Sequence, residues 1–488
     1  MDRGKLEGLA LRTLSRIRKP VRCISGITVV AVMAKPYPCP HGRCAYCPGG
    51  VEIGTPQSYM SDSPAVLRAL RCGFDPYEQV RSRLKTYISM GHNPSKVELI
   101  IMGGTFPAMP LDYQEWFVAQ ALEALNRFPR NKPQGWVGLE EAQRRNERSA
   151  IRCVGLTIES RPDWALERHV DGFLRLGATR VELGVQSIYD EVLRRVDRGH
   201  GVRESIRATR ALKDAGYKVV YHMMPGLPGS DLDKDYAMFK EIFNNPSFRP
   251  DMLKIYPTLV IPGTKLYEMW KRGVYKPYSL EELLELLIKV MKIIPRYVRV
   301  MRIQRDIPVH HVAAGLRVGN LRELLEKELS ARGIKSGEIR AREVGHVLLK
   351  RGIVPDEKDV KLCRMTYEAS GGTEVFLSVE DVKRDILIGF LRLRIPSSKA
   401  HRWEVDERTA IVRELHVYGP EVPVGERGLW WQHRGYGSLL LREAERIALE
   451  EFGESKMLII SGVGVREYYR KRGYRKLKGS FYMYKRLH

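Results

Sequence analysis

Long apolar runs are missing from this 488-residue sequence. The longest, 27–34 and 97–102, fall far short of the roughly 20 residues that a membrane-spanning helix needs. The N-terminal stretch 1–22 also lacks the apolar core and the small-residue cleavage site of a secretory signal. We therefore expect no membrane insertion and a cytoplasmic location.

Cysteine is scarce, and its number is odd. The seven cysteines are Cys23, Cys39, Cys44, Cys47, Cys72, Cys153 and Cys363, and only Cys39, Cys44 and Cys47 are clustered. Small secreted domains carry dense, even-numbered sets of cysteines that form a disulfide framework. The cysteine count argues against a protein of that class.

Acidic residues are fewer than basic ones: 58 Asp and Glu stand against 82 Lys and Arg, which gives a formal net charge of +24. Such an excess attracts polyanions and holds phosphate backbones in a salt-dependent way. Nucleic acid is therefore the leading partner; the alternative is a solvated basic surface that serves only solubility. We expect the basic segment 1–22 and Arg296, Arg299, Arg302 and Arg305 to contact phosphates, so charge reversal at Arg299 and Arg302 should weaken binding.

Apolar runs that are typical of strands alternate with amphipathic stretches that are typical of helices over the first three hundred residues. The strand candidates are 27–32, 97–102, 153–158, 180–184, 218–223 and 252–256. Repeated strand-helix units predict an α/β fold with a parallel sheet, either doubly wound or a full or partial barrel, with function at the carboxyl ends of the strands. We divide the chain into a basic segment 1–22, a first α/β domain 23–305, a linker module 306–360 and a second α/β domain 361–488.

The three clustered cysteines have the spacing Cys-x4-Cys-x2-Cys and follow the first predicted strand. Three thiolates on one short loop can ligate three corners of a [4Fe-4S] cubane, which leaves the fourth iron without a protein ligand. The alternative is structural zinc, which takes four ligands, or thiols without a metal. The iron-sulfur cluster is favoured, because structural zinc needs a fourth ligand and no fourth cysteine lies near the three in the sequence.

With these residues the sequence resembles the radical S-adenosylmethionine (SAM) enzymes, in which the open iron binds SAM. Their usual spacing is Cys-x3-Cys-x2-Cys, so the extra residue here is a departure. Together with Gly49 and Gly50 after the triplet, that departure resembles the archaeal-type catalytic subunit of Elongator, the tRNA carboxymethyluridine synthase family. Further matching stretches are 19–20, 25–27, 96–106, 155–163, 182–187, 222–229 and 339–344. The resemblance implies a partial parallel (βα) barrel of radical SAM type, a linker and a GNAT-type α/β acetyltransferase domain.

The resemblance also implies which residues bind SAM. Backbone groups of Gly103, Gly104 and Thr105 would hold the methionine amino group, since glycine lets a ligand approach the chain closely. Glu159 would accept from the ribose hydroxyls and Arg161 would bind the methionine carboxylate, unless these two residues merely pair with each other. Gln186, together with Met223 and Met224, would line the adenosine side.

In the second domain the stretch 432–437, Gln-His-Arg-Gly-Tyr-Gly, precedes a predicted helix and resembles the pyrophosphate loop of GNAT acetyltransferases. Acetyl-CoA is the implied ligand, because backbone amides at a helix N-terminus bind pyrophosphate well. The residues implied to contact it are Glu414, Leu415, His416, Val417, Gln432, Gly435, Tyr436, Gly437 and Ser438. Tyr469, or alternatively Tyr468, would place a hydroxyl at the thioester sulfur, unless both are core aromatics. Lys96 would contact acetyl-CoA from the first domain and completes the candidate catalytic residues.

The family's mechanism joins the two halves. A radical derived from SAM takes hydrogen from the acetyl methyl group, the resulting carbon adds to carbon 5 of a tRNA wobble uridine, and thioester hydrolysis leaves 5-carboxymethyluridine. Two rival functions stay open: a lysine acetyltransferase with a structural cluster, and a tRNA-binding scaffold without catalysis. A homodimer and accessory subunits are further partners that stay open.

Two features depart from the family. The region before Cys39 is shorter than the basic extension of many relatives. Ser336 and Gly337 stand where many relatives carry a cysteine near a structural zinc, so we expect no zinc in the linker.

Overall fold

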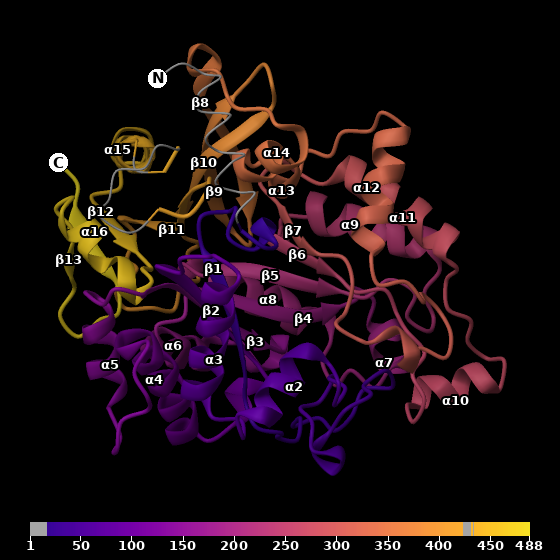
Figure 1. Ribbon diagram of the computed structural model, residues 1–488. Helices are drawn as coiled ribbons and strands as arrows, with labels where there is room; N and C mark the ends of the chain where they lie inside the picture. The colour runs from indigo at the N-terminus through magenta and orange to yellow at the C-terminus, as the bar shows by residue number, and fades with distance from the viewer. Residues whose placement is uncertain (1–16, 423–430, 433) are drawn as a thin grey trace.

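The computed structural model describes residues 17–422, 431–432 and 434–488. Two seven-stranded sheets lie side by side, and the orange and yellow C-terminal half rests against the indigo and magenta N-terminal half (Figure 1). Within the described residues, no helix combines the length and the apolar character that a membrane crossing requires.

The first sheet is entirely parallel, and its strands follow one another in chain order. They are β1 (Thr28–Met33), β2 (Lys96–Met102), β3 (Arg152–Ser160), β4 (Arg180–Gln186), β5 (Lys218–Met223), β6 (Met252–Ile255) and β7 (Arg299–Arg302). Since β1 and β7 are not paired, the sheet stays an open half-barrel. All strands run in the same direction, so every strand-to-helix loop emerges at one edge. This confirms the predicted partial barrel.

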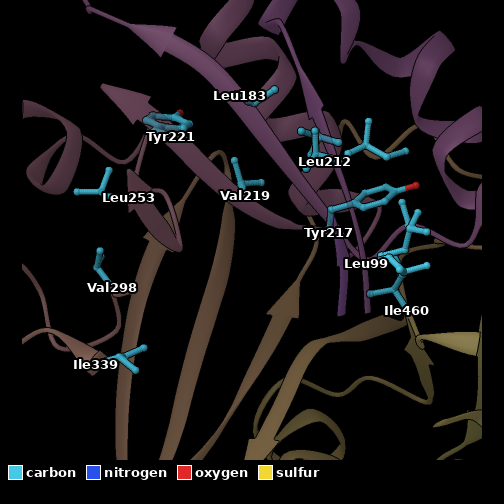
Figure 2. Close-up of a cluster of buried hydrophobic side chains, with 14 of the residues drawn as sticks. Leu99, Leu183, Leu212, Tyr217, Val219, Tyr221, Leu253, Val298, Ile339 and Ile460 are labelled. Carbon is cyan, nitrogen blue, oxygen red and sulfur yellow. The ribbon is translucent and has the colours of Figure 1, made fainter. Parts of the chain in front are cut away.

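Helices cover the outer face of this sheet. They are α2 (Pro64–Arg71), α3 (Pro76–Ser89), α4 (Leu111–Arg127), α5 (Leu139–Asn146), α6 (Glu167–Leu176), α8 (Val202–Asp214), α9 (Leu232–Asn244) and α11 (Leu280–Ile293). Two further helices, α7 (Asp190–Arg195) and α10 (Lys265–Lys271), pack instead beside the loop that carries Cys44 and Cys47. Side chains of a strand alternate between its two faces, and the apolar ones point toward these helices. Leu99, Leu183, Tyr221 and Leu253 of four strands lie in this core, with Leu212 of α8 (Figure 2).

The linker carries α12 (Leu321–Ala331), α13 (Ile339–Arg342) and α14 (Val344–Arg351). The second sheet has the order β13-β14-β12-β11-β10-β9-β8. Its elements are β8 (Val360–Ala369), β9 (Gly372–Asp381), β10 (Ile386–Ile395), β11 (Thr409–Val417), α15 (Tyr436–Arg446), β12 (Lys456–Ile459), α16 (Arg466–Arg470), β13 (Arg475–Lys476) and β14 (Met483–Arg486). Ile339 of α13 and Ile460, just after β12, join the same apolar core as the first sheet, so the core is continuous across the two halves (Figure 2).

Buried ion pairs also connect the two sheets. Arg413 of β11 donates to both carboxylate oxygens of Asp251, just before β6, over 2.8 and 2.6 Å, and to Glu374 of β9 over 2.7 Å. These side chains are fully buried. Removing one partner of such a network leaves an uncompensated buried charge, which costs about 3–5 kcal/mol. The relative position of the two sheets is therefore strongly specified.

Candidate functional site

The cysteine loop lies at the carboxyl edge of the first sheet, directly after β1. Cys44 and Cys47 are each 3% exposed, and Cys39 is half-buried. Each thiol has a polar side chain beside it: Thr105 Oγ1 lies 3.4 Å from Cys39, His41 Nε2 lies 3.1 Å from Cys44 and Ser58 Oγ lies 3.2 Å from Cys47. Burial raises the pKa of the Cys39 thiol, because a buried thiolate is poorly solvated. A metal that replaces the thiol proton would stabilise this thiolate.

The donor set fits an iron-sulfur cubane better than a single ion. The three cysteine sulfur atoms are spread too widely to bind one metal ion together. Two other groups of the described chain are close enough to do so: Asp62 with His310 and His311, and Glu159 with Glu182 and His222. Thiolates are the ligands that iron-sulfur clusters take. Cys39, Cys44 and Cys47 would hold three irons.

Most of the predicted SAM residues gather at this same edge. Gly103 and Gly104 follow β2 with φ of +147° and +81°, and a side chain on Gly104 would approach Cys39 Sγ to 3.9 Å. The left-handed backbone conformation at both positions favours glycine, and the contact at Gly104 places it beside Cys39. Thr105 follows them, and Gln186 ends β4 with a buried Oε1 atom that has no hydrogen-bond partner in the described chain. An unpaired buried acceptor at the sheet edge suits a ligand donor.

Glu159 and Arg161 do not pair with each other. Glu159 accepts from Tyr59 over 2.7 Å and lies 3.8 Å from Lys254. Arg161 donates to Asp163 over 3.0 Å and to His41 Nε2 over 2.9 Å. Burial raises the pKa of Glu159 and lowers that of Arg161. Arg161 therefore supports the cysteine loop through His41, a contact that the sequence did not indicate.

Met223 is not at the cluster side. It is 0% exposed and lies in the main apolar core, because its position on β5 points toward the helices. The next residue, Met224, packs in a separate apolar group with Cys44 and Cys47. Of the two methionines predicted to line the adenosine side, Met224 is therefore the one beside the cysteine loop, because adjacent residues of an extended chain face opposite sides.

A second site lies at the opposite, amino-terminal edge of the first sheet. A cavity of about 930 Å³ separates this edge from β11 and α15. The predicted acetyl-CoA residues that line it are Lys96, Glu414, Leu415, His416, Val417, Gln432, Gly435, Gly437, Ser438, Tyr468 and Tyr469. Tyr436 is not among the lining residues; its ring packs 6.0 Å from that of Trp431.

The strand beside this cavity is only partly paired on one side. β11 pairs with β12 from Thr409 to Val412, and no other strand of the described residues pairs with 413–417 on that side. An extended ligand can add to such an edge through main-chain hydrogen bonds. A pantetheine chain has the amide groups for this, so the splayed strands fit acetyl-CoA.

Lys96 and Gln432 meet across the two halves. Lys96 Nζ donates to Gln432 Oε1 over 2.7 Å, and Gln432 Nε2 donates to the Val417 carbonyl over 2.9 Å. Burial lowers the pKa of Lys96 to about 8. Lys96 is therefore a cavity residue in contact with the second half and not a surface lysine, and its contact with acetyl-CoA stays a prediction.

The two tyrosines differ in surroundings. The Tyr468 hydroxyl is buried without a hydrogen-bond partner in the described chain, and a side chain on Gly437 would approach it to 2.7 Å. The guanidinium of Arg472 lies 3.5 Å above the Tyr468 ring and donates to Ser438 Oγ over 2.7 Å. Tyr469 packs edge-on against Tyr468, and burial raises its pKa. Arg472 is a cation at the predicted pyrophosphate seat that the sequence analysis missed.

Charged side chains on the inner face of the half-barrel connect the two edges. Glu98, which lines the cavity, pairs with Arg180, whose Nε atom lies 3.9 Å from Glu182. Lys254 pairs with Glu182 and lies 3.8 Å from Glu159 at the other edge. Although burial opposes it, the Lys254 ammonium holds the pKa of Glu182 well below its usual range. Alternating positions thus give a charged inner face and an apolar outer face.

Three of the arginines predicted to contact phosphates pair with carboxylates of the protein. Arg296 pairs with Glu380 over 2.7 Å and with Asp385 over 2.6 Å. Arg299 pairs with Glu343 and donates to Tyr418 over 2.9 Å, and its side chain is 13% exposed. Although burial acts against it, Arg299 lowers the pKa of Glu343 to about 2. Arg302 pairs with Asp306. The prediction that Arg299 contacts a tRNA phosphate was therefore wrong, because Glu343 of the linker already pairs with it and its side chain faces the cavity between the two sheets. Most of segment 1–22 lies outside the described residues.

The linker offers one group of possible metal ligands. His310 and His311 each place Nε2 2.8 Å from the same oxygen of Asp62. The expectation of no linker zinc was argued from cysteines alone and stays a prediction.

Comparisons with known proteins identify the family of the chain. Residues 36–241 match the radical SAM superfamily and residues 250–331 match the radical SAM C-terminal domain. The chain is 55% identical over 94% of its length to the tRNA uridine(34) acetyltransferase of Methanocaldococcus jannaschii, covering 85% of that protein. It is 48% identical to the mouse Elongator complex protein 3, over 96% of this chain and 86% of that protein. Among solved structures, the Methanocaldococcus infernus Elp3 that lacks its N-terminal residues 1–46 is 51% identical, with a TM-score of 0.83 over 95% of this chain and 100% of that one.

Proposed function

The chain belongs to the family of the tRNA uridine(34) acetyltransferases and Elongator complex protein 3, within the radical SAM superfamily, and from this membership we propose its reaction. It is a tRNA-modifying acyltransferase that uses SAM-derived radical chemistry and acetyl-CoA to make 5-carboxymethyluridine at the wobble uridine. This membership favours the proposal over a lysine acetyltransferase or a scaffold without catalysis.

A radical SAM domain takes a [4Fe-4S] cluster and SAM, which supply a radical that can remove an unactivated hydrogen. The protein's own residues bind the cluster and SAM and orient them. Cys39, Cys44 and Cys47 hold the cluster, the backbone at Gly103 and Gly104 admits SAM, and Gln186 offers its unpaired oxygen to a donor of SAM.

The observation that carries the acetyl-CoA part is the cavity of about 930 Å³ between the two sheets. Its lining includes the partly unpaired edge of β11, Gly435 and Gly437 at the start of α15, and Lys96 of the first sheet. The Tyr468 hydroxyl faces Gly437 at the pyrophosphate seat, so we assign the hydroxyl at the thioester sulfur to Tyr469. Burial raises the pKa of Tyr469, which keeps its proton available for donation to a thiolate.

Transfer RNA is the proposed substrate, since a wobble base lies in a single-stranded loop and can enter a pocket, and the net charge of +24 suits its phosphates. The division into 1–22, 23–305, 306–360 and 361–488, a cytoplasmic location, a homodimer and accessory subunits stay predictions.

The test is anaerobic reconstitution of the cluster, followed by incubation with SAM, acetyl-CoA, a reductant and unmodified tRNA. Mass spectrometry of the digested nucleosides should show carboxymethyluridine only when every component is present. A Cys44→Ser variant should give none. Lysine acetylation of basic proteins by that variant, with no modified nucleoside from the wild type, would favour the acetyltransferase alternative.

A further inference from the structure

Arg198 is a buried cation beside the cysteine loop that the reaction as described does not use. It follows α7 and is 7% exposed. Its Nη2 and Nε atoms donate to the Gly184 carbonyl over 2.5 and 3.2 Å, and its Nη1 atom lies 3.6 Å from Cys44 Sγ. The guanidinium thus reaches from the end of β4 to a predicted cluster ligand.

The segment around Arg198 is packed directly on the cysteine loop. The Ala45 amide donates to the Val196 carbonyl over 2.9 Å. Gly199 has φ of +76°, and a side chain there would approach His41 Cβ to 2.6 Å. Only glycine allows this contact, so the position of Arg198 relative to Cys44 is fixed by the backbone on both sides.

Arg198 differs from the other buried arginines because no carboxylate of the described chain pairs with its guanidinium. Every other buried arginine of the described chain has an Asp or Glu oxygen within 4.0 Å, for example Asp163 for Arg161, Glu98 for Arg180 and Asp214 for Arg394. Arg198 has none among the residues that the structure describes. A guanidinium stays charged, and a buried charge needs an opposite charge nearby.

The cysteine sulfurs are the anions within its reach. His41 is a weaker candidate donor, because Arg161 Nη1 donates to the same Nε2 atom that faces Cys44. His41 then carries its proton on Nδ1, which is buried without a partner in the described chain. Thr105 and Ser58 can donate to the other two sulfurs, but they are neutral. Among the described residues, Arg198 is the only arginine or lysine that donates to one of the three thiols.

We propose that Arg198 is the internal counter-ion of the iron-sulfur cluster, donating to Cys44 Sγ and raising the cluster's reduction potential. Three thiolates make the cluster assembly anionic, and reduction adds one more negative charge. A nearby cation stabilises the reduced form more than the oxidised form, and hydrogen bonds to cluster sulfurs act in the same direction. Arg198 is therefore a positioning and tuning residue, and the inference rests on the proposed cluster at Cys39, Cys44 and Cys47.

The test uses the full chain with its cluster reconstituted anaerobically, without SAM. Arg198→Gln removes the charge and Arg198→Lys keeps it. Arg194→Gln is the matched control, since it removes the same charge from an exposed position four residues earlier. Iron and sulfide are quantified first, and the potential of the cluster is then measured by a redox titration followed by electron paramagnetic resonance.

We expect the equilibrium constant for cluster reduction to fall at least tenfold in Arg198→Gln, which is about 59 mV for a one-electron couple. Arg198→Lys should stay closer to the wild type, and Arg194→Gln should match it. Iron loss in Arg198→Gln with iron retained in Arg198→Lys also supports the proposal. An unchanged potential in iron-replete Arg198→Gln overturns it, as does equal iron loss in both Arg198 variants. If the wild type itself takes up no iron, the proposed cluster fails instead.

Discussion

The two edges of the first sheet differ in what surrounds them: loops that contact one another lie at the carboxyl edge, and an open cavity lies at the amino edge. At the carboxyl edge, loop side chains bind one another: Arg161 contacts Asp163 and His41, and each cysteine has a polar neighbour. At the amino edge, a cavity of about 930 Å³ stays open between two packed sheets, and Tyr468 has no hydrogen-bond partner in the described chain.

The difference follows from what each edge must hold. A cluster needs three thiolates in a fixed geometry, so the loop that carries them is locked by neighbours. A long, extended ligand needs backbone edges and space, which splayed strands at a domain boundary provide. If this comparison is right, substitutions at one edge should leave binding at the other edge intact, except where the two halves are joined.

The sharpest separation comes from Cys44→Ser. We expect the iron content to fall from about four per chain to near zero and SAM cleavage to stop, because a cluster ligand is lost. The affinity for acetyl-CoA should not change. Cys363→Ser, in a half-buried strand of the second domain, is the matched control and should keep its iron. Iron analysis and calorimetry check both statements, and undiminished SAM cleavage would contradict the assignment.

The exception should be Arg413→Met, which breaks the junction between the two sheets. Asp251 and Glu374 would lose a buried cation, at a cost of about 3–5 kcal/mol. We expect a lower unfolding temperature together with losses at both edges, measured by calorimetry, iron content and acetyl-CoA affinity. Arg446→Met, which removes an exposed arginine of α15, should change none of them. A variant that affects only the acetyl-CoA side would show that the halves are less coupled than their contacts indicate.

A pH effect is expected from Lys96. Burial lowers its pKa from 10.5 to about 8, so between these values the unfolded chain binds more protons than the folded one. Stability conferred by this group therefore rises with pH in that window. The free energy of unfolding of the wild type relative to Lys96→Met should increase by about 1–2 kcal/mol from pH 7.5 to 9.5. Denaturant titrations at several pH values measure it, and a flat difference would mean that Lys96 is not desolvated.

The smallest effect is expected from Gly437→Ala. The added methyl group would meet the Tyr468 hydroxyl at 2.7 Å, so the ring must shift within the acetyl-CoA cavity. We expect about tenfold weaker acetyl-CoA binding, about 1.4 kcal/mol, with normal iron content. Gly319→Ala, where nothing lies within 4 Å, is the control. Equal acetyl-CoA affinities of Gly437→Ala and Gly319→Ala would contradict the prediction that Gly437 belongs to the pyrophosphate-binding loop.

Strand order and the cysteine loop could be predicted from the sequence, because both are local patterns. Alternating β-strand candidates and helices predict a parallel sheet, and Cys-x4-Cys-x2-Cys is a contiguous motif. Arg198, Lys254 and Arg413 were missed because a lone basic residue carries no local signal. Their roles depend on neighbours that are distant in the chain.

The errors have the same origin. Arg299 belongs to a basic stretch, but Glu343 of the linker pairs with it. Met223 and Met224 are adjacent in sequence and lie on opposite faces of the strand end, so only the register decides which one packs near the cluster.

The central claim is that both edges serve one reaction. The most direct test supplies the reconstituted protein and unmodified tRNA with acetyl-CoA that carries three deuterium atoms on its methyl group. The account predicts one deuterium in the 5′-deoxyadenosine that is released and two in the carboxymethyl group of the nucleoside. Unlabelled 5′-deoxyadenosine, formed together with an acetylated lysine or no nucleoside product, would contradict it.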